Sequence, residues 1–320
     1  MSRLRSLVLA LILGIAMVLG LSACTSRAGE WTDQTYTIAG GGTTGVYSEY
    51  GSHLADELST ALGVDVVGAE TNGSVDNLLR VADGDALLGF AQGDTAADAV
   101  AGVGAFHEPL PVRAVARLYD EYLHVVVRAD SAVESIPQLE GRTVSLGAEN
   151  SGVNVIAGRV LDAAGIDRSA VRDAQLDLSD SIAAMERGEI DGFFWVGGLP
   201  TPGIRELAEQ LPVRLLPIEL EWVNTVNARY SDAYRPADFP AGIYGLTDST
   251  PTMAVPNYLL AAASTPDAMV RDVLEVLFDA RSRMGSEVPA VALLNRRQAI
   301  FTAPVELHPG AVEYYRDSRR

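Results

Sequence analysis

The stretch that decides the fold reads YTIAGGGTTGVYSEYGSHLADELSTALG, residues 36–63. Its first four residues form a short β-strand pattern, and a glycine-rich loop at residues 40–45 follows at once. Apolar residues then recur four apart from Val46 to Leu62, which predicts a helix. Gly63 stands where a glycine commonly ends a helix. The stretch therefore predicts a strand, a glycine-rich loop and a helix, as at the start of an α/β domain.

The same pattern occurs a second time in the chain. A strand at residues 143–146 leads into the loop GAENSG, residues 147–152, and then into a helix at residues 153–164. A strand (residues 174–178), a helix capped around Ser179 or Asp180, and another strand (residues 190–195) follow. The first copy likewise continues with a strand at residues 64–67, a helix from near residue 74 and a strand at residues 86–91. Strands that alternate with helices are typical of parallel sheets covered on both faces. The sequence therefore predicts two α/β lobes, each with a glycine-rich loop after its first strand.

Two apolar runs outside the copies indicate how the lobes are joined. The runs at residues 123–128 and 258–263 suit two strands that cross from one lobe to the other. We therefore expect the first lobe to contain residues 35–122, completed by residues 258–320, and the second lobe to contain residues 123–257.

The first residues of the chain have the composition of an export signal. Two arginines precede an uncharged apolar run at residues 7–21, which is shorter than a typical membrane span. Cys24 follows this run and resembles the acylated cysteine of bacterial lipoproteins. We expect a signal peptide at residues 1–23 and a tether at residues 24–34, so that a lipid holds the exported protein at the outer face of the cell membrane. The alternative is a buried free cysteine at the end of an uncleaved anchor.

Composition narrows the range of functions. The chain has 320 residues, its 24 basic residues are all arginine, and its 42 acidic residues bring the formal charge to −18. This charge disfavours nucleic-acid binding, and the length suggests two domains. The single cysteine excludes a disulfide framework and a cysteine-based zinc site. The four histidines have no metal-ligand spacing, so we expect no metal site, and we also expect no cofactor.

Candidate ligand-binding residues follow the strands at their carboxyl ends, where ligands of open α/β sheets bind. The N–H groups at a helix N-terminus form an anion site there without a charged side chain. We therefore expect the loops at residues 40–47 and 147–154 to line one cleft that holds a small carboxylate. The candidates are Gly42, Thr43, Thr44, Gly45, Tyr47, Asn72, Ser74, Gln92, Ser151, Gly152, Asn154 and Trp195.

Most of these candidates have a structural alternative. The Thr43 hydroxyl can bind a carboxylate or cap the first helix. Tyr47 can present its phenol to a ligand or pack in the core. Asn72 and Ser74 stand at a strand-to-helix turn, where simple capping is the alternative. Trp195 ends a buried strand, so it can form a wall of the cleft or belong to the core.

Several motifs together resemble those of the TAXI family of TRAP-transporter solute receptors. They are GGGTTGVY (40–47), TNGSVDNL (71–78), LGFAQGD (88–94), LHVVVRADS (123–131), the loop at 147–154, FFWVGGLPTP (193–202) and HPGAVEYY (308–315). The resemblance covers nearly the whole chain after the expected tether, in the right order.

This resemblance implies a type II periplasmic-binding-protein fold, in which two α/β lobes joined by crossing hinge strands close on a small solute. It implies an extracytoplasmic receptor that captures an amino-acid-like or carboxylate solute, with glutamate-like solutes favoured, and delivers it to a TRAP-type permease. We expect no enzymatic activity and a monomer. The main alternative is a lipoprotein that uses the same cleft to report ligand occupancy to a membrane signalling protein.

An enzymatic interpretation has less support. Gly40, Gly42 and Gly45 match the spacing of the dinucleotide-binding fingerprint, and Asp65 follows at a suitable distance. The acidic residue of that fingerprint belongs at the end of the second strand, however, whereas Asp65 stands near its beginning. A chain without lysine also has no Walker A motif, and no Gly-x-Ser-x-Gly motif occurs.

Overall fold

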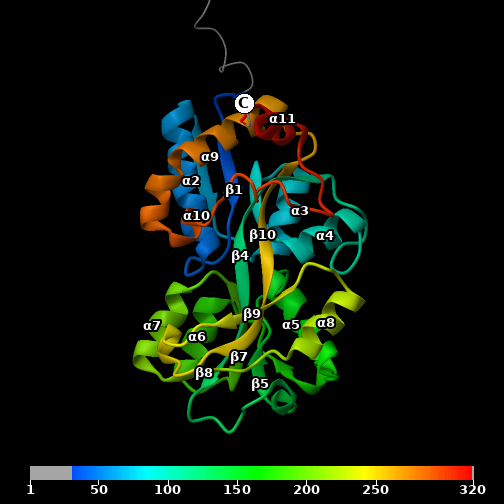
Figure 1. Ribbon diagram of the computed structural model, residues 1–320, viewed down its shortest axis with the longest axis vertical. Helices are drawn as coiled ribbons and strands as arrows, with labels where there is room; N and C mark the ends of the chain where they lie inside the picture. Colours follow the sequence, from blue (N-terminus) through cyan, green and yellow to red (C-terminus); the bar gives the residue numbers. More distant parts are fainter. Residues whose placement is uncertain (1–30, 319–320) are drawn as a thin grey trace, which may run out of the picture. The chain divides into compact units, whose positions relative to one another are not determined.

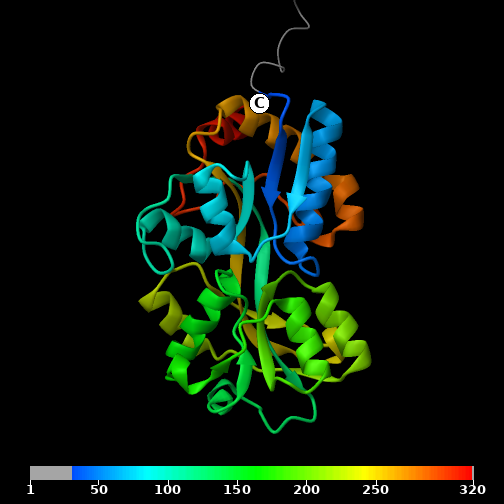
Figure 2. The same ribbon diagram turned by 180° about the vertical axis from the view of Figure 1, so that it is seen from behind.

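The computed structural model describes residues 31–318, and from Thr35 onward the chain forms one compact unit (Figures 1 and 2). The expected signal peptide at residues 1–23, Cys24 and most of the expected tether lie outside the described residues. Among residues 31–318, no helix combines the length and the apolar composition that crossing a bilayer requires.

The strands of the described chain form one hydrogen-bonded sheet in the order β2-β1-β3-β10-β4-β7-β5-β6, with β8 paired to β4 and β9 paired to β10. The strands are β1 (Thr35–Ala39), β2 (Asp65–Ala69), β3 (Leu88–Gln92), β4 (Val112–Arg128), β5 (Thr143–Ser145), β6 (Arg172–Asp173), β7 (Gly192–Gly197), β8 (Val213–Leu215), β9 (Arg235–Phe239) and β10 (Thr250–Ala262).

Helices cover both faces of this sheet (Figure 1). Around β1, β2 and β3, helices α2 and α9 pack together on one side of the sheet, and α3 and α4 pack together on the other. Around β5 and β7, helices α6 and α7 form the pair on one side, and α5 and α8 form the pair on the other. The helices are α2 (Val46–Leu62), α3 (Ser74–Asp83), α4 (Gly93–Ala101), α5 (Gly152–Ala163), α6 (Leu178–Glu186), α7 (Pro202–Gln210), α8 (Leu220–Arg229), α9 (Asp267–Glu287), α10 (Pro289–Ala292) and α11 (Pro309–Asp317).

The predicted repetition is confirmed by the strand order. In the first copy β1 lies between β2 and β3, and in the second copy β5 lies between β6 and β7, with parallel pairing throughout. Helix α2 ends where predicted, and Gly63 adopts the left-handed conformation with a φ of 69°. Both copies therefore place their glycine-rich loop at the carboxyl end of the middle strand.

Two long antiparallel strands, β4 and β10, join the copies. The first part of β4 pairs with β10, and its last part pairs with β7 and β8. Strand β10 pairs with β3 near its end and with β9 at its start. The predicted apolar run at residues 123–128 belongs to β4, and the run at residues 258–263 belongs to β10 except for residue 263. The predicted lobe boundaries fall within or next to the two strands.

One predicted strand, residues 174–178, is wrong. The second strand of this copy, β6, ends at Asp173, whose carboxylate accepts hydrogen bonds from the N–H groups of Leu146 and Gln175. Gln175 then turns the chain with a φ of 52°. Leu178 already belongs to α6, because Asp177 caps that helix. The apolar residues of this segment pack beside the sheet instead of extending it.

Candidate functional site

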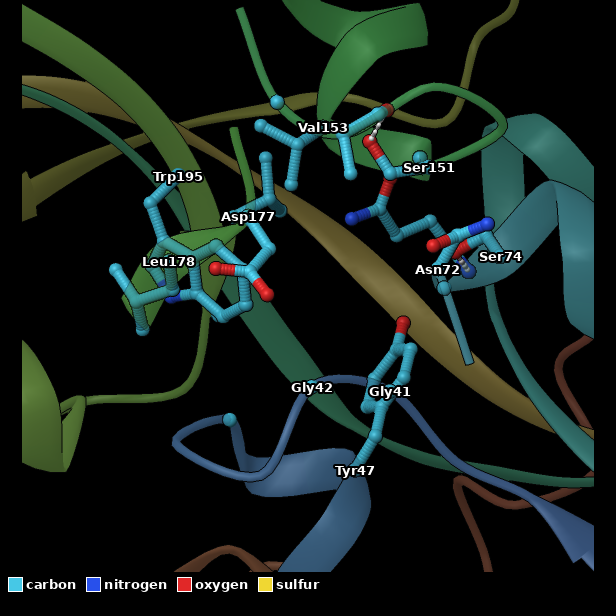
Figure 3. A pocket seen from close by; sticks show the side chains of 18 of the residues that line it. Gly41, Gly42, Tyr47, Asn72, Ser74, Ser151, Val153, Asp177, Leu178 and Trp195 are labelled. Atoms are coloured by element: carbon cyan, nitrogen blue, oxygen red, sulfur yellow. Dashed lines mark hydrogen bonds between the residues drawn. The ribbon is translucent and has the colours of Figure 1, made fainter. Parts of the chain in front are cut away.

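A cavity lies where five helices begin (Figure 3). Helices α2, α3, α5 and α6 start at residues that line it, namely Val46, Ser74, Gly152 and Leu178, and α4 starts directly after Gln92. The cavity contains about 650 Å³ of space between atoms, including the part open to solvent. Helices from both copies of the repeated unit therefore point their N-termini at one space.

Most of these N-termini have backbone donors left for a ligand. Gly45, Gly73 and Gln92 occupy the N-cap positions of α2, α3 and α4 without a side-chain capping bond, whereas the Ser151 hydroxyl caps α5. The first N–H groups of a helix have no partner within it and carry a partial positive charge. The cavity can therefore bind an anionic group through backbone N–H groups alone.

The charged side chains that line the cavity are both acidic. They are Glu121 and Asp177, and no arginine or histidine is among the described lining residues. An anion bound here would depend on helix N-termini for its positive partner, while the two carboxyl groups suit a cation or a hydrogen-bond donor.

Glu121 lies on β4 at the floor of the cavity and is only 1% exposed. Its Oε1 accepts a hydrogen bond from the Tyr119 hydroxyl at 3.1 Å, and its Oε2 accepts one from the Tyr47 hydroxyl at 3.0 Å. Burial raises the pKa of Glu121 to about 7, although hydrogen bonds from these tyrosines and from Asn257 and Gln92 lower it. The floor of the cavity thus holds a carboxyl group that is neutral over part of the physiological pH range.

Asp177 approaches the cavity from the opposite copy. Its Oδ1 accepts a hydrogen bond from the backbone N–H of Asp180 at 2.8 Å and so caps α6. Its Oδ2 lies 4.0 Å from the position that a Cβ atom on Gly42 would take. Figure 3 shows the carboxylate pointing toward this glycine, so Asp177 faces the loop after β1 across the cavity.

Apolar side chains form the wall beside Asp177. Trp195 and Leu178 stand beside Asp177 in Figure 3, and both line the cavity, as does Val153. The Trp195 indole donates a hydrogen bond to the Thr201 hydroxyl at 3.3 Å, and a Cβ atom on Gly45 would lie 3.3 Å from the indole ring. The wall can therefore accept the aliphatic or aromatic part of a solute.

The two halves of the cavity touch each other. The backbone N–H of Asp76 on α3 donates to the carbonyl of Asn150, in the loop after β5, at 3.1 Å. A Cβ atom on Gly152 would overlap Gln92 Oε1 and lie 2.7 Å from Ser74 Oγ. The structure therefore shows the cleft closed, with the start of α5 against the starts of α3 and α4.

Most of the candidates from the sequence line this cavity, but three do not. Those that do are Gly42, Gly45, Tyr47, Asn72, Ser74, Gln92, Ser151, Gly152 and Trp195. Thr43 is exposed and does not cap α2, whose N-cap is Gly45. Thr44 packs against Gly203 of α7. The Asn154 backbone N–H donates to Ser151 Oγ at 3.1 Å, and its side-chain amide donates to the Gly147 carbonyl at 3.4 Å, so Asn154 stabilises its own loop.

Sequence reasoning missed both carboxyl groups of the cavity. A signal for Glu121 exists, because it alternates with the buried residues Tyr119 and Leu123 and so belongs on their face of the strand. For Asp177, the helix start was predicted two or three residues too late, at Ser179 or Asp180. No group of three or more potential metal-ligating side chains occurs within the described part of the chain.

Comparisons with known proteins agree with this architecture. A model of the NMT1-like family matches residues 38–318. The phosphonate-binding protein PhnD1 of Prochlorococcus marinus, solved with methylphosphonate, is 12% identical with a TM-score of 0.54, over 89% of this chain and 96% of that one. A binding-protein component of an ABC phosphonate transporter from Pseudomonas aeruginosa is 11% identical with a TM-score of 0.54, over 82% and 80%. The predicted α/β fold with two lobes, as in periplasmic binding proteins, is thereby confirmed.

Proposed function

The chain belongs to the NMT1-like family, and we propose that it is an extracytoplasmic receptor that binds a small solute and delivers it to a membrane transporter. The observation that carries this proposal is the closed cleft, which brings helix N-termini from both copies of the repeated unit onto one cavity. Two lobes joined by strands suit hinged closure around a ligand. Binding and release, without covalent chemistry, are the activity that this arrangement supports best.

The chemistry of the cleft favours an amino-acid-like solute. Backbone N–H groups at the starts of α2 and α3 suit a carboxylate, and Glu121 and Asp177 suit an ammonium group. The wall that includes Trp195 suits the apolar part of a side chain. The resemblance to TAXI receptors favours glutamate-like solutes, whereas the apolar wall also favours an aliphatic side chain such as that of leucine.

We expect the purified chain from residue 35 onward to bind at least one L-amino acid and to be stabilised by it. The probes are L-glutamate, L-leucine, glutarate and methylphosphonate. A ligand present at 100 times its Kd raises the free energy of unfolding by about 2.7 kcal/mol, which a thermal shift detects and calorimetric titration confirms. Methylphosphonate is the comparison probe, and tighter binding of this probe than of any amino acid would contradict the proposed solute class. Turnover of a probe would contradict a pure binding function.

We further propose that the partner is a TRAP-type permease and that the receptor works as a monomer. The support is the motif resemblance over residues 40–315. The phosphonate-binding protein from Pseudomonas aeruginosa belongs to an ABC transporter, and a signalling partner would use the same cleft. Reconstituted with its permease, a TRAP receptor supports solute uptake that stops when the ion gradient is dissipated and does not need ATP. Uptake that requires ATP would contradict the TRAP proposal.

We also propose that the protein is exported and anchored by lipid at Cys24. The support is the apolar run at residues 7–21 followed by the single cysteine of the chain. We expect mass spectrometry of the protein from its native membrane to find a chain that begins at Cys24 and carries acyl groups. A Cys24→Ala variant should be released from the membrane fraction. An unmodified cysteine in a membrane-bound chain would contradict the anchor.

A further inference from the structure

The floor of the cleft contains a buried carboxyl group with no cation beside it. Tyr47 and Tyr119 each donate one hydrogen bond to Glu121, and the lining residues described include no arginine or histidine. Asn257 and Gln92 also form hydrogen bonds that favour the charged form of Glu121, so hydrogen bonds are present but a positive partner is not. A buried carboxylate without a positive partner is costly unless it is protonated or receives further donors.

Two neighbouring strands add further acceptors. Gln92 on β3 and Asn257 on β10 are paired in register, and both side chains are buried. Gln92 Oε1 and Asn257 Oδ1 have no hydrogen-bond partner within the described chain. The Asn257 amide donates one hydrogen bond to the Tyr47 hydroxyl at 2.5 Å, and that hydroxyl donates to Glu121. Neither of these two protons is therefore available to the unpartnered amide oxygens. The two amide groups therefore direct N–H groups to Glu121 and Tyr47 and leave two buried amide oxygens without a donor.

We propose that Glu121 is a specificity-determining residue that receives an ammonium group of the bound solute and gives up its own proton to the solvent when that group binds. This inference rests on the proposed function and goes beyond it, since it assigns one buried side chain to one group of the solute. The ammonium group supplies the missing positive charge. Gln92 Oε1, which lies against Gly152 at the start of α5 and has no hydrogen-bond partner in the described chain, is the second acceptor for this group.

Asp177, the other carboxylate of the cleft, is less suited to this role. One of its oxygens already caps α6, and the helix N-terminus stabilises its negative charge. Its side chain is also half-buried and in contact with solvent, whereas Glu121 is buried. The protein itself stabilises the charge of Asp177 but not that of Glu121, so Glu121 is the better partner for the ammonium group.

Matched pairs of probes test the assignment in the whole folded chain from residue 35. L-glutamate is compared with glutarate, and L-leucine with 4-methylpentanoate, because each pair differs only by the amino group. We expect the wild type to prefer the amine by roughly tenfold or more, the size of a charge-assisted hydrogen bond. Glu121→Gln should abolish this preference and the release of a proton on binding, measured by titration in buffers of different ionisation enthalpy. Glu189→Gln, in an exposed ion pair with Arg187 and outside the lining of the cavity, should keep both.

The outcomes separate the inference from the proposed function. If no probe binds, the proposed function fails and the inference fails with it. If amino acids bind but Glu121→Gln keeps the preference for the amine, or Glu189→Gln removes it, only the inference is overturned.

A measurement without ligand tests the state of Glu121 directly. Because burial raises the pKa of Glu121 to about 7, the folded chain keeps a proton that the unfolded chain loses above about pH 4.5. Stability of the wild type relative to Glu121→Gln should therefore fall as pH rises from about 4.5 to about 7. The titratable groups that face Glu121 are Tyr47 and Tyr119, whose pKa values burial raises well above 10, so they stay neutral in this window.

A nearby histidine has the opposite effect but is common to both variants. Burial lowers the pKa of His124 to about 3. The folded chain therefore becomes less stable as pH falls below about 6.5, because the unfolded chain takes up a proton on this histidine that the folded chain does not. Its contribution cancels when the wild type is compared with Glu121→Gln at each pH. A difference that does not change between about pH 4.5 and about pH 7 would overturn the inference even if no ligand were found.

Discussion

Replacing Arg159 with methionine is expected to lower the free energy of unfolding by about 3–5 kcal/mol, because it leaves buried carboxylates without their counter-charge. Arg159 lies on α5 and is 7% exposed. Its Nη1 donates to Asp94 Oδ2 at 2.9 Å and to the Tyr234 hydroxyl at 3.0 Å, and its Nη2 pairs with Asp98. The two aspartates belong to α4, so this cluster joins the two copies of the repeated unit.

The cost of burying the two charged aspartates is offset only while the arginine is present. Asp94 is fully buried and Asp98 nearly so, and burial raises the pKa of Asp98 although Arg159 lowers it. The Tyr234 hydroxyl also donates to Asp94, at 2.5 Å, and one hydroxyl does not replace a guanidinium group. Removal of one partner from a buried ion pair is therefore far more costly than removal of the whole pair.

Chemical denaturation of three variants tests this expectation. Arg187 forms a comparable ion pair with Glu189 at 2.7 Å, but both side chains are more than half exposed, so Arg187→Met should leave stability unchanged within error. The triple variant Arg159→Met, Asp94→Asn, Asp98→Asn should be more stable than Arg159→Met alone, because the uncompensated charges are gone. A loss below about 1 kcal/mol for Arg159→Met, in the range of a surface pair, would contradict a buried cluster.

A second large effect is expected on ligand affinity from Gly152→Ala. Gly152 is the first residue of α5, and a Cβ atom there would overlap Gln92 Oε1 and lie 2.7 Å from Ser74 Oγ. To make room, the Gln92 side chain must turn into the cavity or α5 must withdraw from α3. Both changes act on the closed cleft, and crowding of this kind costs about 1–3 kcal/mol.

Affinity for the best amino-acid probe should therefore fall by about 5- to 150-fold in calorimetric titration. Gly158→Ala is the matched control, since Gly158 lies in the same helix and a Cβ atom there would meet only the end of the Arg168 side chain at 3.4 Å. This control should keep its affinity. Unchanged affinity in Gly152→Ala would show that solute binding does not need the closed contact between α5 and Gln92.

Much of the fold follows from local sequence patterns. The spacing of apolar residues in α2 and the position of Gly63 set that helix within one residue, because both depend on neighbours three or four positions away. The repeated order of strand, loop and helix was enough to predict two lobes. The strand predicted at residues 174–178 failed, because hydrogen bonds to Asp173 and the turn at Gln175 decided that segment, and neither leaves a pattern of period two.

The loops of the candidate site were also predictable, since each follows a strand whose end the sequence marks. Individual side chains within them were not. Thr43 and Asn154 belong to the right loops, but backbone geometry turns Thr43 to the solvent and uses Asn154 within its own loop. Loop membership is a local property, whereas the direction of a side chain depends on the path of the whole loop.

The sequence by itself thus determined the α/β class, the repeated unit and the edge of the sheet where the cavity lies. Only the tertiary structure decided that Glu121 stands at the floor of the cleft and that Arg159 meets Asp94. Arg159 is 65 residues from Asp94 in the chain, and Glu121 is 74 residues from Tyr47. Charge and hydrogen-bond balance in a buried site depend on every group that surrounds it, and those groups come together only when the strands β4 and β10 cross and the two lobes meet.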